Sequence, residues 1–153
     1  MIHDPAMQNC LAQLSGIAKR VTGDTVHDYR LIYGLKKELQ RKQKNQRDDK
    51  KAYAREDKAH LGLAYLLLFH PSSLVRHEAA FVLGEYGRTY SSFLRASALL
   101  DPETIVRHEA TLALSARSQR GLAFRNKFLL EYIATHDESR MVRDTARVSL
   151  DNL

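Results

Sequence analysis

The sequence is poor in the residues that shape β-structure and in those that cross-link secreted domains. Only 7 glycines and 3 prolines occur among 153 residues, too few for the turn every ~8 to 12 residues that a β-sandwich or barrel needs. The single cysteine, Cys10, cannot form a disulfide within the chain, and residues 1–14 lack the apolar stretch of a secretory signal. These absences favour an all-α protein in a reducing, cytoplasmic setting.

Long apolar runs are also absent. The longest, residues 61–69, has about half of the ~20 residues required to cross a bilayer, so we expect no membrane span. Hydrophobic residues nevertheless make up 44% of the chain, which is enough to build a core and argues against disorder of the whole chain. A chain of this length fits one structural unit, and we expect residues 1–153 to form a single domain.

Positive charge is unevenly distributed. The net charge is +6, and residues 36–58 alone hold ten Lys or Arg against five Asp or Glu. Residues 40–51 contain no apolar side chain, so they predict an exposed connection or a helix that extends into solvent. Such a segment could attract an acidic protein surface or, more weakly, nucleic acid. A solvated charged loop without a partner is the alternative, favoured by the interspersed acids and by the lack of a stacking aromatic.

Three copies of one motif are present. Residues 73–84, 104–115 and 140–151 align with spacings of 31 and 36 residues. Four positions are identical in all copies: Val75, Val106 and Val142; Arg76, Arg107 and Arg143; Ala79, Ala110 and Ala146; Leu83, Leu114 and Leu150. The Val, Ala and Leu positions recur at i, i+4 and i+8, which predicts a helix packed through one face, with the small Ala allowing a neighbouring helix close approach.

Each copy follows another apolar helical segment, so each unit is expected to be a helix hairpin. The joints are His70-Pro71, Asp101-Pro102 and Asp137-Glu138, where Asp predicts a cap for the next helix. A fourth unit at the front has predicted helices at about 5–20 and 24–39. The apolar segments that precede the three copies are residues 53–69, 90–100 and 122–134.

Four stacked hairpins, with eight helices in all, predict an α-solenoid in which each unit contacts mainly its neighbours. The expected units are about 5–39, 52–87, 89–118 and 121–152, with the polar connection 40–51 between the first two. The first and last units match the motif least and are expected to be the caps.

The pattern Asp-x(4)-Val-Arg-x-x-Ala-x-x-x-Leu, from Asp101 and from Asp137, resembles the HEAT-like repeats of the phycobilisome-lyase type. His70 replaces the Asp in the first copy, where we expect a loop contact to an Arg to be lost. A His-Glu pair directly after the repeat Arg resembles the deoxyhypusine hydroxylases among these proteins. The pairs are His77-Glu78 and His108-Glu109, whereas the third copy has Asp144-Thr145.

The resemblance implies an iron enzyme. Deoxyhypusine hydroxylases have two halves of four repeats, with His-Glu pairs in the middle two repeats of each half and a non-haem di-iron centre between the halves. This chain resembles one half, so the resemblance implies a homodimer in which His77, Glu78, His108 and Glu109 face their symmetry mates and hold iron. The implied reaction is a monooxygenase hydroxylation. In the family its substrate is a modified lysine on a translation factor, whose amine a carboxylate near the metal could hold.

A structural role is the alternative for these side chains. The His and Glu positions lie off the Val-Ala-Leu face, so they are also compatible with exposed polar residues or a capping pair. The second functional hypothesis is a non-catalytic interaction scaffold that binds an acidic partner through residues 36–58 and the Arg row. The remaining histidines have no repeat counterpart and are expected in surface, cap or loop positions: His3, His27, His60, His70 and His136.

Overall fold

The computed structural model describes residues 16, 18–45, 58–86, 91–115 and 123–153, and this part of the chain is all-helical, without a strand. The predicted all-α class is therefore confirmed, whereas the helix expected at 5–20 lies largely outside the described residues. None of the described helices is both long and apolar enough to cross a membrane. The helices are α2 (Thr25–Asn45), α3 (Lys58–Phe69), α4 (Ser73–Tyr86), α5 (Ser91–Leu100), α6 (Thr104–Leu114), α7 (Ala123–His136) and α8 (Arg140–Asp151).

The first described helix, α2, starts after a tight turn and extends beyond its apolar pattern. Gly23 has a φ of 81°, and Asp24 Oδ1 accepts a hydrogen bond of 2.7 Å from the His27 backbone N–H, which caps the helix. The helix continues past Leu39 to Asn45, because polar residues such as Gln, Arg and Lys are good helix formers. Part of the charged connection is thus a helix extension, and residues 46–57 lie outside the described part of the chain.

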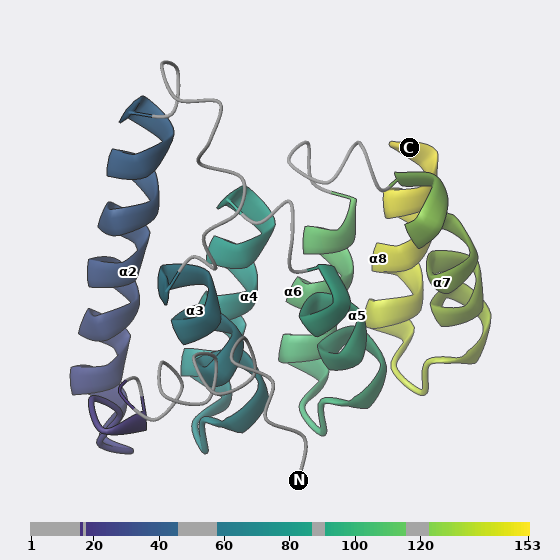
Figure 1. Cartoon of the computed structure of the whole chain (residues 1–153). Coiled ribbons are helices and arrows are strands. Elements are labelled where there is room, and N and C mark those ends of the chain that lie inside the picture. The colour runs from purple at the N-terminus through teal and green to yellow at the C-terminus, as the bar shows by residue number, and fades with distance from the viewer. Residues whose placement is uncertain (1–15, 17, 46–57, 87–90, 116–122) are drawn as a thin grey trace, which may run out of the picture.

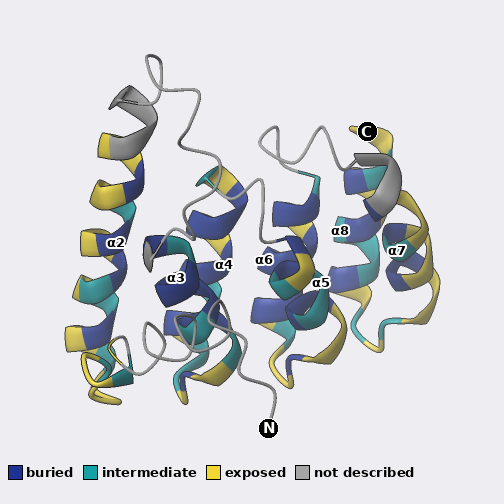
Figure 2. Ribbon diagram, in the orientation of Figure 1, coloured by how far each residue is buried: buried dark blue, intermediate teal, exposed yellow. Residues whose placement is uncertain are grey.

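Helix pairs follow one another in chain order from one end of the molecule to the other (Figure 1). Within each pair the helices pack together, as α3 with α4, α5 with α6 and α7 with α8. The second helices also pack on one another, α4 between α2 and α6, and α6 between α4 and α8. Figure 2 shows that burial concentrates where the helices face each other, while the outer side of α2 is exposed.

The repeated apolar positions form the packed face that their periodicity predicts. The Val and Ala of all three copies are fully buried, as are Leu83 and Leu114, whereas Leu150 in the last helix is partly exposed. Close approach occurs at Gly84, where an added Cβ would lie 2.7 Å from the Cβ of Ala113. Small residues on both helices are therefore required for α4 and α6 to pack at this distance.

Consecutive units are joined by ion pairs at the loop end, which we call the loop pairs. Arg76 donates from Nε and Nη2 to the two carboxylate oxygens of Asp101 in the next loop, at 2.8 and 3.0 Å. Arg107 binds Asp137 in the same way, at 2.9 and 3.2 Å. The Nη1 of each arginine donates to two backbone carbonyls of its own preceding loop. Each guanidinium thereby connects two successive loops.

The two joint aspartates do not cap their helices as expected. The N-cap residues of α6 and α8 are Glu103 and Ser139, and neither has a capping side-chain hydrogen bond. Asp101 instead accepts from the Glu103 N–H at 2.9 Å, and Asp137 from the Ser139 N–H at 2.8 Å, while each faces its arginine. Their role is to hold the loop and to pair with the previous unit.

The first loop pair has its donor and acceptor positions exchanged. Asp28 occupies in α2 the place of the repeat arginine, and His70 occupies the place of the joint aspartate, with 3.0 Å between His70 Nε2 and Asp28 Oδ2. His70 Nδ1 accepts from the Ser72 N–H at 3.0 Å, so the protonated Nε2 is the donor to Asp28. The side-chain contact to an Arg is lost as expected and is replaced by the contact to Asp28, while Arg76 donates to the backbone carbonyl of His70 at 2.8 Å.

Asp28 is a fully buried carboxylate surrounded by donors. Burial alone raises its pKa, but hydrogen bonds from His27, from the backbone of Thr22 and Gly23 and from His70 outweigh burial and hold the pKa of Asp28 well below its ordinary value. The carboxylate therefore stays ionised and serves as an acceptor that joins the first turn to the second unit.

We expect the close approach of α4 and α6 to be sensitive to one methyl group. Gly84→Ala should lower the free energy of unfolding by about 1 to 3 kcal/mol, because the added Cβ collides with Ala113. Gly34→Ala is the matched control: nothing lies within 4 Å of its added Cβ, and the change should stabilise α2 by up to about 1 kcal/mol. Urea unfolding measures both, and equal effects would contradict the predicted packing.

We expect Asp101→Ala to lower the free energy of unfolding by about 3 kcal/mol, because it leaves the buried Arg76 fork and the Glu103 N–H unpaired. Asp144→Ala is the control, since its ion pairs with Arg140 and Arg147 are exposed and contribute about 1 kcal/mol or less. Thermal or urea unfolding of both variants checks this, and a loss at Asp101 no larger than that at Asp144 would refute the structural role of the loop pair.

Candidate functional site

A second series of contacts joins the helices α2, α4, α6 and α8, and we call its members the face pairs. The Tyr29 hydroxyl donates to Glu78 Oε2 at 3.1 Å, and His77 Nε2 lies 3.4 Å from Glu109 Oε2. His108 Nδ1 and Thr145 Oγ1 are 2.7 Å apart. In each pair, a residue at the His position of one helix contacts the Glu position of the next.

Of the four predicted metal ligands, the structure brings His77 and Glu109 into contact, and they come from different units. His77 contacts the glutamate of the following repeat, Glu109, whereas Glu78 contacts the preceding helix through Tyr29. None of them caps a helix, and Glu109 is only 8% exposed. The face pairs thus replace the expectation of an exposed or capping role with a contact between stacked helices.

His108 is neutral, and its hydrogen bonds fix which nitrogen carries the proton. Burial lowers its pKa below the ordinary value, and the nearby His77 lowers it further. The Thr145 hydroxyl donates its one hydrogen to the Met141 carbonyl at 2.8 Å, so it accepts from His108 Nδ1–H. The lone pair of the neutral ring therefore resides on Nε2, as it does in a histidine that binds a metal and donates its other N–H to the protein.

Glu109 is a buried carboxylate with little compensation. Burial raises its pKa, the charge of His77 acts in the opposite direction, and the charge of Glu78 raises it further; the net pKa is raised. His77 is the one side chain in the described part of the chain that forms an ion pair with Glu109, and at 3.4 Å the contact is long. A cation bound close to Glu109 would therefore stabilise its ionised carboxylate.

Glu78 is accompanied by an aromatic donor. Burial raises the pKa of Tyr29 to about 12, and the hydrogen bond and charge of Glu78 contribute. Tyr29 therefore remains protonated at neutral pH and holds Glu78 Oε2 as an acceptor. Its contact fixes one carboxylate oxygen and leaves the second for another partner.

A complete metal site does not form within one chain. Among the residues that the structure describes, no group of three or more His, Cys, Asp or Glu side chains is placed to hold a metal ion. The donor types nevertheless fit a transition metal, because imidazole nitrogen and carboxylate oxygen suit iron and zinc. Any metal at this face needs ligands in addition to those that one chain brings together.

Tyr29 and Thr145 were not predicted from the sequence. Thr145 occupies the Glu position of the third copy, where the His-Glu pair is absent, and Tyr29 lies in a unit without the motif. Their shared register with the His-Glu pairs was the available signal. At a spacing of 48 residues, Asp28 and Tyr29 of α2 align with Arg76 and His77.

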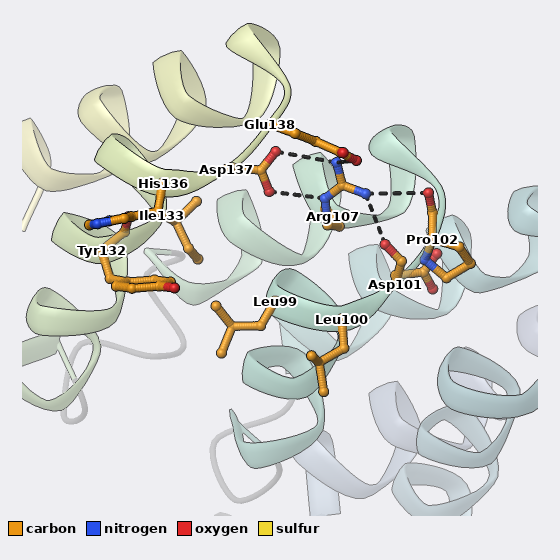
Figure 3. Close-up of a pocket in the computed structure, with 10 residues that line it drawn as sticks. All are labelled: Leu99, Leu100, Asp101, Pro102, Arg107, Tyr132, Ile133, His136, Asp137 and Glu138. Atoms are coloured by element: carbon orange, nitrogen blue, oxygen red, sulfur yellow. Dashed lines mark hydrogen bonds and ion pairs between the residues drawn. The ribbon is translucent and has the colours of Figure 1, made fainter.

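The loop pairs form the wall of two equivalent pockets on the loop edge. One, of about 440 Å³, lies between the α5–α6 and α7–α8 loops and is shown in Figure 3, where Arg107 bridges the loops above Leu99, Leu100 and Tyr132. The other, of about 270 Å³, lies one unit earlier, beside Arg76. In the larger pocket, Arg107 is already paired with Asp137 and Glu138 and with the Asp101 carbonyl, as its bonds in Figure 3 show.

Comparison with known proteins adds no relative from which a role could be transferred. No protein-family model, curated protein or solved structure matches the chain. A function for this chain must therefore be inferred from the geometry of the molecule.

We expect His108 to be the Nδ1–H tautomer at neutral pH. Two-dimensional 15N–1H NMR of the imidazole should show this state, and Thr145→Val should abolish the preference by removing the acceptor, whereas Thr145→Ser retains it. The pKa of His108 is lower in the folded protein than its ordinary value of 6.5. Its contribution to the free energy of unfolding is therefore fully present at pH values above 6.5 and is lost as the pH falls below that value. An Nε2–H tautomer, or a protonated ring at pH 7, would contradict the assignment.

Proposed function

We propose that this chain is a HEAT-like α-solenoid that binds iron at the face pairs as a homodimer. The observation that carries the proposal is His108, whose lowered pKa and fixed Nδ1–H leave the Nε2 lone pair available near His77, the partner of the buried Glu109. Such ligand orientation by an outer hydrogen bond is typical of metal-binding histidines.

The solenoid part of the proposal rests on repeated contacts. Helices α4, α6 and α8 stack through equivalent faces, and the loop pairs recur with the same atoms in successive units. A stack in which each hairpin contacts its neighbours is the arrangement of helical repeat proteins.

The dimer supplies what one chain lacks. A single chain provides two His and two Glu, with no three of the described ligand-type side chains placed around one point. A two-fold axis beside the face pairs would set the same residues of a second copy opposite them, so that each metal draws ligands from both copies. Iron bound there would supply oxygen activation, and we propose hydroxylation as the reaction, in line with the resemblance to deoxyhypusine hydroxylases.

In this proposal the residues have different tasks. His77 and His108 bind iron through imidazole nitrogen. Glu109 provides a buried carboxylate, which a bound cation would stabilise. Tyr29 orients Glu78, whose second oxygen binds iron or the cationic amine of a substrate. Thr145 is a positioning residue, because it acts through His108.

We expect protein purified without chelator to carry about one iron per chain in a dimer. His77→Ala combined with His108→Ala should remove the iron, whereas His136→Ala, an exposed histidine away from the face pairs, should retain it. Elemental analysis and mass in solution measure both. Metal-free monomer that takes up no ferrous iron would overturn the proposal.

For the scaffold hypothesis, Arg143 is the one arginine of the row that stays available to a partner. Arg76 and Arg107 are 7% and 4% exposed and pair within the chain, so the arginine row offers a partner little at these positions. Lys36, at the start of the basic segment, pairs with Glu85 at 2.8 Å and lies over the Phe81 ring. Arg143 differs from the other two arginines, and its surroundings lead to a separate inference.

A further inference from the structure

Arg143 is held like the other repeat arginines on one side only. Its Nη1 donates to the carbonyls of Asp137 and Glu138, at 2.7 and 2.9 Å, as the Nη1 of Arg107 does to its own loop. In Arg76 and Arg107, Nε and Nη2 hold an aspartate of the next loop. Within the described residues, the Nε and Nη2 of Arg143 have no partner.

The guanidinium of Arg143 is therefore oriented before any ligand arrives. Two carbonyls fix one edge of the planar group, and the opposite edge presents two parallel donors, the geometry that binds a carboxylate through both oxygens. Little side-chain freedom remains to be lost on binding, because the carbonyl contacts have already ordered the arginine.

The surrounding surface has a positive excess. Arg140 and Arg147 flank Arg143 on α8, and Asp144 is the acid between them, paired with both. At the equivalent positions, α6 has Thr104 and the buried Thr111, which lie in the stack. The outer side of α8 thus replaces small residues with arginines, which suits an acidic partner better than another apolar helix.

We propose that Arg143 is a binding site for an aspartate on a loop of a partner protein. The ligand enters as Asp101 and Asp137 do in the preceding units, with both carboxylate oxygens on Nε and Nη2. Those aspartates also accept an N–H two residues further along their own loops, so the favoured ligand is an aspartate at the start of such a turn. The site is at the opposite end of the stack from Tyr29 and uses none of the proposed metal ligands.

A probe is available in the chain itself. A synthetic peptide of residues 97–106, SALLDPETIV, carries Asp101 with the turn that binds Arg76. Adding it to the full chain labelled with 15N should shift the Arg143 Nε–H signal in a saturable way. The same peptide with Asp101→Asn should bind about tenfold more weakly or worse, because the charged bidentate contact is lost.

Variants of the protein distinguish bidentate binding by the Arg143 guanidinium from general electrostatic attraction. Arg143→Lys keeps the charge but lacks the two parallel donors, and it should lose the response to the peptide. Arg140→Lys, on the same helix, should retain it. The comparison of the two peptides on the wild-type chain is independent of how well Arg143→Lys folds.

Two results would overturn the inference. Equal binding of the Asp and Asn peptides, or no saturable shift, would show that Arg143 is not a carboxylate site. An Arg143 Nε–H signal that moves with the concentration of the protein alone, lost together with self-association in Arg143→Lys, would show that a second copy of this chain is the occupant instead.

Discussion

A planar guanidinium held between two successive loops is the contact on which the stacking of the units depends. A helix hairpin of this size cannot bury its apolar face alone, so stability requires neighbours in a fixed register. Arg76 and Arg107 each satisfy two carbonyls of one loop and a carboxylate of the next. Apolar burial supplies most of the driving force, and these polar bridges determine which positions meet, since a slipped stack would leave charges buried and unpaired.

The face pairs inherit their geometry from that register. Once the loops are fixed, the residue after each arginine falls opposite the next helix, which sets His77 beside Glu109 and His108 beside Thr145. A metal-binding role and a packing role are compatible here, because an imidazole held through one nitrogen can ligate through the other. The same contact that stabilises the stack would then prepare the ligand.

Local patterns were predictable from the sequence, and long-range partners were not. The recurrence of Val, Ala and Leu at helical spacing correctly located α4, α6 and α8 and their buried faces. The motif also singled out His77 and Glu109, yet it could not show that they bridge different units. The roles of Asp28 and Thr145 were not predicted, because each differs in chemistry from its repeat counterparts. A contact between helices depends on register and complementarity, which can persist while the residue type changes.

The exchanged donor and acceptor of the first loop pair make the units non-interchangeable. Asp28 is matched by the imidazole of His70, whereas the later joints carry aspartates. If α2 docked one unit too far along the chain during folding, two carboxylates would face each other in a buried place. A duplicated inner unit inserted after α2 would meet the same conflict unless both members of the pair changed together. The complementary pair at the first joint thereby specifies the order in which the hairpins stack.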